Sequence, residues 1–101
     1  MAEVIWAIPA LNDLESILEY IDLDNPGAAR GLARKVFERA ARLEKFPNSG
    51  SKPKELKGTP YRRIFVDPVF LYHRREGEAV YVIHASRAEK AFDMDRIIQN
   101  E

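Results

Sequence analysis

The chain of 101 residues has no cysteine and only two histidines, His73 and His84. Without cysteine there are no disulfides, no catalytic thiolate and no metal site built on sulfur, and the composition fits a reducing cytoplasm, where we expect the protein to act. The two histidines are not spaced as in an HxxxH site, and no EF-hand loop is present, so no metal site is predicted. Each histidine lies in a strand-like segment, where a packing role is the simplest expectation.

Long hydrophobic runs and glycine-rich phosphate loops are also missing. No apolar run approaches the roughly 20 residues of a membrane-spanning helix. The first residues, MAEVIWAIPALNDLE, show no basic region followed by an apolar one, so neither a membrane span nor a signal peptide is predicted. The chain has no P-loop and no GxGxxG motif, and we expect no cofactor. Ser49, Ser51 and Ser86 have no neighbouring base in the sequence that would activate a nucleophile.

The net charge is zero, but the charges are unevenly distributed along the chain. Residues 1–24 carry six acids and no base. Residues 25–46 carry six bases and two acids, and residues 50–76 carry seven bases and three acids. A surface polarised in this way steers charged partners. With 46% hydrophobic and 32% charged residues, the sequence suits one folded domain over residues 1–101.

The N-terminal half predicts a strand followed by two helices. Residues 3–6 form a short apolar run typical of a strand. Residues 9–23 have apolar side chains at helical spacing, with Pro9 in the first turn. For the second helix, Asp24 or Asn25 is the expected cap, Pro26 lies in the first turn, and Pro47 follows the end. Because the join is short, the two helices are predicted to form an antiparallel hairpin.

The C-terminal half predicts three strands, over residues 61–66, 69–75 and 79–85, each rich in β-branched and aromatic residues. The polar tail after them is expected to be a short helix or a loose arm. The order β-α-α-β-β-β predicts an α+β fold in which the helical hairpin packs on one face of a mostly antiparallel sheet. The other face is expected to be open.

Arginines occur in pairs within the predicted strands, at residues 62–63 and 74–75. Alternation of side chains places one member of each pair toward the helices and one away. Their long stems also allow a plain solvated role. Two functions remain open from the residues alone. One is acid–base cleavage of RNA with cations stabilising the reacting phosphate, and the other is binding of a protein partner.

Three segments carry a resemblance to a known family. They are DLESILEYIDLDNPGAA, LEKFPNSG and YRRIFVDPVFLYHRREGEAVYVIHASR. In this order and spacing the chain resembles the RelE/ParE superfamily of toxins from bacterial type II toxin–antitoxin systems, from Val4 to about Arg87. RelE-like members are ribosome-dependent mRNA endonucleases, and ParE-like members inhibit DNA gyrase. The shared fold does not distinguish the two activities.

The nuclease branch implies a set of site residues. The resemblance assigns phosphate stabilisation to Lys57 (or to Lys52 or Lys54) in the loop, to Arg63 in a strand, and to Arg87 at the end of the last strand. It also calls for a C-terminal tyrosine or histidine that transfers a proton. No such residue follows Arg87, and Phe92 stands near the expected position. His84 is a weaker substitute, so the ParE-like branch is favoured and catalysis is not expected.

The resemblance also implies a protein partner. A cognate antitoxin is expected to lay a helix across the hairpin and an extended segment along the sheet, forming a hetero-oligomer. Arg63, Arg74 and Arg87 are the predicted contacts on the sheet side. On the hairpin side the candidates are Leu14, Leu18 and Val36, although core packing is the simpler role for all three. The remaining predicted partner is DNA gyrase, or the ribosome and mRNA in the alternative.

Overall fold

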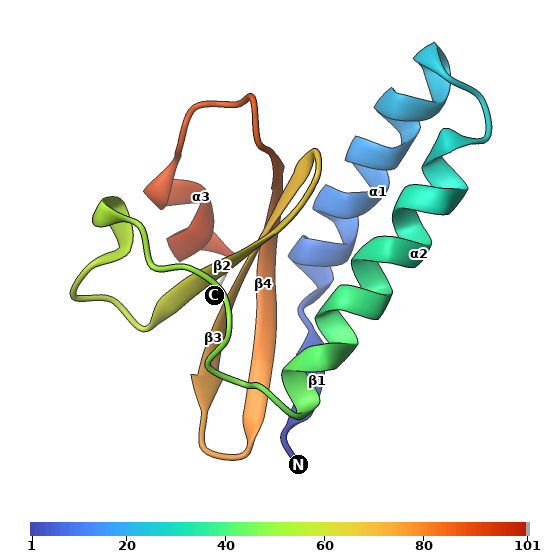
Figure 1. The fold of residues 1–101 in the computed structure, drawn as a ribbon. Helices are drawn as coiled ribbons and strands as arrows, with labels where there is room; N and C mark the ends of the chain where they lie inside the picture. The colour runs from blue at the N-terminus through green and yellow to red at the C-terminus, as the bar shows by residue number, and fades with distance from the viewer. Residues whose placement is uncertain (101) are drawn as a thin grey trace.

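The computed structural model describes residues 1–100. Its elements are β1 (Glu3–Trp6), α1 (Ile8–Asp24), α2 (Ala28–Ala41), β2 (Tyr61–Val66), β3 (Val69–Glu76), β4 (Ala79–Arg87) and α3 (Met94–Gln99), with short 3-10 turns at Arg42–Glu44 and Lys54–Leu56. The predicted order is confirmed, and the C-terminal tail contains a short helix. Helices α1 and α2 lie together on one side of the sheet (Figure 1).

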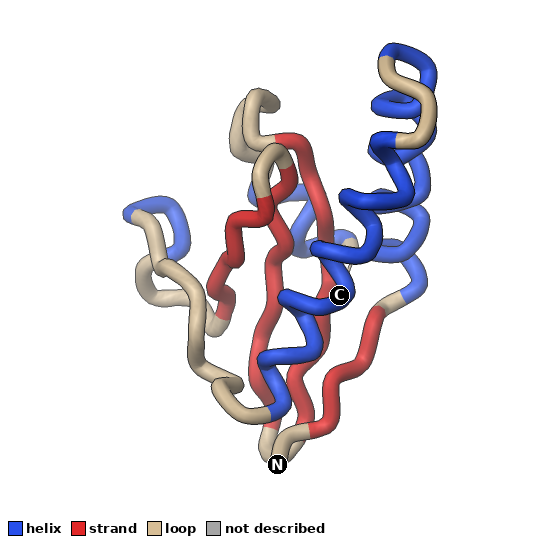
Figure 2. Tube along the Cα trace, turned by 45° about the vertical axis from the view of Figure 1, so that its right-hand side comes forward, coloured by secondary structure: helices blue, strands red, loops and turns tan. Residues whose placement is uncertain are grey.

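The four strands form one sheet in the order β1-β4-β3-β2. β1 pairs in parallel with β4, and the other pairings are antiparallel, as the mostly antiparallel prediction requires. The loop between α2 and β2 runs beside the β2 edge, where Ser51 and Arg63 form an isolated bridge (Figure 2). That bridge partly closes an edge that would otherwise expose unpaired backbone groups.

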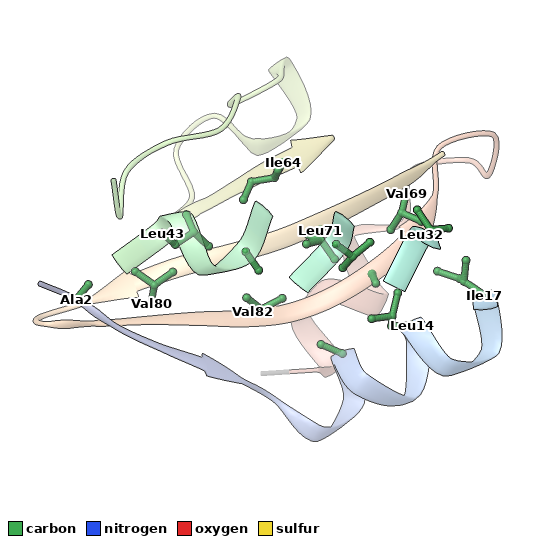
Figure 3. Close-up of a cluster of buried hydrophobic side chains, with 14 residues drawn as sticks. Ala2, Leu14, Ile17, Leu32, Leu43, Ile64, Val69, Leu71, Val80 and Val82 are labelled. Atoms are coloured by element: carbon green, nitrogen blue, oxygen red, sulfur yellow. The ribbon is translucent and has the colours of Figure 1, made fainter. Parts of the chain in front are cut away.

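Apolar side chains fill the space between the hairpin and the sheet (Figure 3). Leucines and valines of both layers are buried here, including Leu14 of α1 and Val36 of α2. Their burial makes core packing the role that this conformation shows, and contact of either side chain with a partner stays a prediction. The hairpin covers the sheet as the helical spacing predicts. Leu18 is half-buried against the same cluster and keeps an accessible face.

The sequence predicts an open face on the other side of the sheet, but in the structure this face is covered. α3 lies on that side, away from α1 and α2 (Figure 1). A second cluster is buried there, made of Leu56, Tyr61, Tyr72, Ile83 and Ile97. Large aromatic side chains on this face give α3 an apolar surface to cover. Asp93 starts the helix, because its Oδ1 accepts hydrogen bonds from the backbone N–H groups of Asp95 and Arg96.

The junction between α1 and α2 also differs from the prediction. α1 continues to Asp24, and the Asn25 N–H donates to the Ile21 carbonyl, so neither residue caps α2. α2 begins after Gly27, whose φ of 89° is in the left-handed region, and it has no side-chain cap. The Gly27 N–H instead donates to the Asp22 carboxylate at 3.0 Å. Among residues 1–100, no helix is long and apolar enough to cross a lipid bilayer.

Candidate functional site

A cleft of about 420 Å³ opens between α1, the end of β4 and the segment that leads into α3. This volume falls within the range of ~300–1,000 Å³ that is usual for small-molecule sites. Its lining combines aromatic, cationic and acidic side chains with one imidazole. The lining residues are Asp13, Ser16, Ile17, Tyr20, Tyr72, His84, Ala85, Ser86, Arg87, Lys90, Ala91, Asp93 and Arg96.

The cleft exists because β1 is shorter than β4. β1 ends at Trp6, which is paired with Val82, so the last residues of β4 have no strand on that side. α1 runs along this edge instead. The backbone N–H of Ala85 donates to Asp13 Oδ2 at 3.2 Å. The carboxylate thus accepts a hydrogen bond that a neighbouring strand would otherwise accept.

Asp13 connects three elements through one carboxylate. Its Oδ2 lies 2.7 Å from His84 Nδ1 on β4. Its Oδ1 accepts from Arg96 Nη2 at 3.3 Å, and Oδ2 accepts from Asn100 Nδ2 at 3.1 Å. The Asp13 side chain is only 11% exposed. Sequence analysis missed this residue, since an acid in the first half of an amphipathic helix carries no signal about partners in the C-terminal part.

His84 has more than a packing role. A shift of register between β3 and β4 at Tyr72/His73 places both Ile83 and His84 on the face away from the hairpin, which plain alternation would not do. The ring stacks on Tyr72 with centroids 5.4 Å apart. Because Nδ1 donates to Asp13, the other ring nitrogen, Nε2, is left for the cleft.

Three cations reach the same cleft from different segments. Arg87 lies at the end of β4, Lys90 in the following loop and Arg96 in α3. The Arg87 guanidinium is 4.0 Å from the centroid of the Tyr20 ring, and its Nη1 is 2.9 Å from Glu89 Oε1. Of the predicted site cations, Arg87 is the one that the structure places in this cleft.

The other predicted cations lie elsewhere. The Arg63 guanidinium is 4.0 Å from the centroid of the Phe70 ring, and that of Arg74 is 4.7 Å from the centroid of Tyr81, both on the sheet face that carries α3. Arg74 also pairs with Glu76 at 2.7 Å. Lys57 is exposed in the loop before β2. The lining of the cleft therefore includes neither Lys57 nor Arg63, and the three residues suggested for phosphate stabilisation do not share it.

A second, shallower groove of about 600 Å³ runs along the outer surface of the hairpin. Leu11, Leu18 and Phe37 provide its apolar floor, and Leu14 contributes a small area beneath them. Acids line the α1 side, and one base lies on the α2 side. These charged residues are Glu15, Glu19, Asp22 and Arg30. Leu18 is thus the predicted hairpin contact that the structure presents at an accessible surface.

His73 is buried in β3 and does not line the cleft. Burial lowers its pKa to about 4, the nearby Arg62 and Arg39 add to the effect, and a hydrogen bond with the Ser49 carbonyl at 3.0 Å opposes it. The imidazole is therefore neutral near pH 7, with Nε2–H donating to Ser49. Among residues 1–100, no group of three or more histidines, aspartates and glutamates is arranged to hold a metal ion.

The lowered pKa of His73 makes stability depend on pH. The unfolded chain takes up a proton on this residue near pH 6.5, and the folded chain does so near pH 4, so folding is penalised as pH falls through this window. Between pH 7.5 and 5 we expect the free energy of unfolding to fall by on the order of 2 kcal/mol from this group. Urea titrations at several pH values measure it. A His73→Leu variant should lose this part of the slope, and an unchanged slope would contradict the assignment.

Three comparisons with known proteins all point to toxins of type II toxin–antitoxin systems. The model of the ParE toxin of type II toxin–antitoxin systems (parDE) matches residues 4–92. Toxin RelE2 of Caulobacter vibrioides is 32% identical over 91 residues, which cover 86% of this chain and 99% of that protein. A structure of the chromosomal ParDE system from P. aeruginosa has a similar fold, with a TM-score of 0.76 at 20% identity over 88% of this chain and 98% of the other. The chain therefore belongs to the ParE toxin family of type II toxin–antitoxin systems, within the RelE/ParE superfamily.

Proposed function

We propose that this toxin inhibits DNA gyrase by binding it, without chemistry of its own. The observation that carries the proposal is the role of Phe92. It stands near the position where the RelE-like pattern calls for a proton-transferring residue, and its ring packs 6.2 Å from that of Tyr72 in the cluster under α3. A phenyl ring cannot transfer a proton, and residues 88–101 contain neither tyrosine nor histidine.

The placement of the arginines supports the same proposal. RNA cleavage needs several cations around one phosphate. Arg63 stacks on Phe70 on the face that carries α3, whereas Arg87 stacks on Tyr20 in the cleft beside α1. Cations spread over different surfaces in this way suit contacts with a large protein partner.

We propose that a cognate antitoxin neutralises the toxin and that the pair acts in the cytoplasm, with residues 1–101 as one domain. The groove on the hairpin suits an amphipathic helix whose apolar stripe covers Leu18 and Phe37. Because the α1 side of the groove is acidic, we expect basic residues on that edge of the antitoxin helix. Arg63 and Arg74 remain the candidates for contacts with its extended segment.

The test is plasmid supercoiling by purified gyrase, titrated with the folded toxin. Inhibition with accumulation of linear DNA on the same gel is expected. Arg63→Ala should raise the concentration needed for inhibition while leaving the circular dichroism spectrum unchanged. Unchanged supercoiling at excess toxin, with folding verified by circular dichroism, would refute the proposal.

The alternative is a ribosome-dependent mRNA endonuclease. One structural observation favours it, namely that His84, oriented by Asp13, lies in the same cleft as Arg87. A relative named toxin RelE2 points in the same direction. In that case Arg87→Ala should slow transcript cleavage on ribosomes by about 100-fold or more. Intact transcripts during growth arrest would exclude this alternative.

A further inference from the structure

We propose that the cleft between α1, β4 and α3 binds a small ligand that carries a phosphate group, with Arg87 and His84 as direct contacts. The shared chemistry is a phosphate dianion, whether free or as a monoester. The inference concerns binding and includes no reaction. It does not depend on the gyrase proposal, whereas tight binding of RNA in this cleft, which the nuclease alternative requires, would contradict it.

Arg87 is held in place before any ligand arrives. Its side chain is only 16% exposed, and the Tyr20 ring supports the guanidinium at 4.0 Å. A guanidinium has five N–H donors in a rigid fork, and the contact with Glu89 engages Nη1. The other donors remain for the paired oxygens of a phosphate, the geometry in which arginine binds this group most strongly.

His84 supplies a second directed contact. Its side chain is 8% exposed and lines the cleft. Asp13 accepts from Nδ1, which fixes the ring, and no hydrogen bond to Nε2 is present among residues 1–100. In the doubly protonated ring both nitrogens are donors, so Nδ1–H donates to Asp13 and Nε2–H can donate to a phosphate oxygen. Asp13 is thus a positioning residue for the imidazole.

The acids around the cleft do not cancel these cations. Asp13 already accepts from side chains and a backbone N–H, and Asp93 caps α3. Glu89 opposes binding most directly, because it pairs with Arg87 at 2.9 Å. Its side chain is 66% exposed, however, and ion pairs at the surface are weak. A phosphate dianion can therefore displace Glu89 from Arg87.

The surroundings favour a small ligand over a nucleic-acid strand. α1 forms one wall of the cleft and carries exposed acids outside it, namely Glu15, Glu19, Asp22 and Asp24. A polyanion leaving the cleft across α1 would be repelled by them. A small molecule avoids this repulsion. Tyr20, which is 56% exposed, adds a ring beside the cations, so a nucleoside monophosphate is expected to bind more tightly than inorganic phosphate.

The two-histidine composition makes a direct test possible. Proton NMR of the whole toxin at low salt follows the imidazole signals during titration with inorganic phosphate, adenosine, adenosine monophosphate and a single-stranded oligonucleotide. The chemical shifts of His84 should change and reach a plateau as either phosphate compound is added. Adenosine monophosphate should reach the plateau at a lower concentration than inorganic phosphate. His73, which is buried elsewhere, should not shift and serves as the internal control.

Matched variants separate a built site from general charge attraction. Arg87→Gln should weaken binding at least about tenfold, since a charge-assisted hydrogen bond is lost. Glu89→Gln should strengthen it by removing the competing carboxylate. Arg75→Gln, which removes an exposed cation at the β3–β4 turn, should leave affinity unchanged. An unperturbed His73 signal shows that each variant has kept its fold.

Three results would overturn the proposal. The first is no His84 shift at millimolar phosphate compound. The second is equal weakening by Arg87→Gln and Arg75→Gln, which would indicate non-specific attraction. The third is tighter binding of the oligonucleotide than of the monophosphate, which would make the cleft part of a nucleic-acid surface.

Discussion

Replacing Asp13 by alanine is expected to lower the free energy of unfolding by about 2–4 kcal/mol, because two donors with little access to water lose their acceptor. The carboxylate is 11% exposed and lies 2.7 Å from His84 Nδ1. Without it, the imidazole N–H and the Ala85 N–H lose their acceptor, and a buried donor left unsatisfied costs about 1–3 kcal/mol. The bond to Arg96 adds little, because that side chain is 55% exposed.

Urea unfolding measures this loss, and the chain offers a close control. Glu15 is an exposed acid on the same helix, and Glu15→Ala should change stability by no more than about 0.5 kcal/mol. Asp13→Asn keeps one oxygen acceptor and should fall between the two. If Asp13→Ala proved as stable as Glu15→Ala, the carboxylate would not be what joins α1 to β4.

The Asp13 contacts also relate the two surfaces of α1. One side of this helix lines the hairpin groove and the other lines the cleft. Arg96 and Asn100 attach the C-terminal part of the chain to the same carboxylate. Asp13→Ala is therefore expected to increase amide exchange in α3 as well. That result would show that the local stability of α3 depends on its contacts with Asp13 of α1.

The order and type of the elements could be read from the sequence because the signals are local. Helical spacing in residues 9–23 and β-branched residues in 61–85 sufficed. The cap of α2 could not be predicted, since Asp24 and Asn25 fit the end of one helix as well as the start of the next. The covered far face also escaped prediction, because a six-residue helix such as α3 has too few apolar positions to reveal its packing partner.

The candidate site was only partly predictable for a related reason. Arg87 could be singled out by its place at the end of the last strand. Its neighbours in the cleft come from α1 and α3, and no local pattern links Asp13 to His84, which lies 71 residues further along the chain. The change of register in β4 decides which face His84 occupies, and strict alternation gives the wrong answer. Strand alternation predicts the face of the sheet on which a side chain lies, but it does not predict which residues of other elements contact that side chain.

Gly50→Ala is the second substitution for which a large loss is expected, roughly 3 kcal/mol or more, from backbone strain together with the loss of hydrogen bonds. Gly50 has a φ of 97°, which L-residues rarely adopt, and an added Cβ would lie 2.7 Å from the Arg63 carbonyl oxygen. That oxygen accepts from the Ser51 N–H at 2.8 Å, and the Arg63 N–H donates back to Ser51 at 2.9 Å. The methyl group would push the loop off the β2 edge.

Gly58→Ala separates the two contributions, because Gly58 also has a positive φ, of 78°, but no atom within 4 Å of its added Cβ. Strain alone should cost about 1–2 kcal/mol there. The difference between the two variants in urea unfolding therefore measures the close approach of the loop to β2. Gly50→Ala should also perturb the His73 imidazole, whose Nε2 would lie 3.3 Å from the new methyl group. If the two variants lost equal free energy of unfolding and the His73 signal were unchanged, the loop would accommodate the methyl group without loss of stability. The Ser51–Arg63 bridge would then not be what holds the loop against β2.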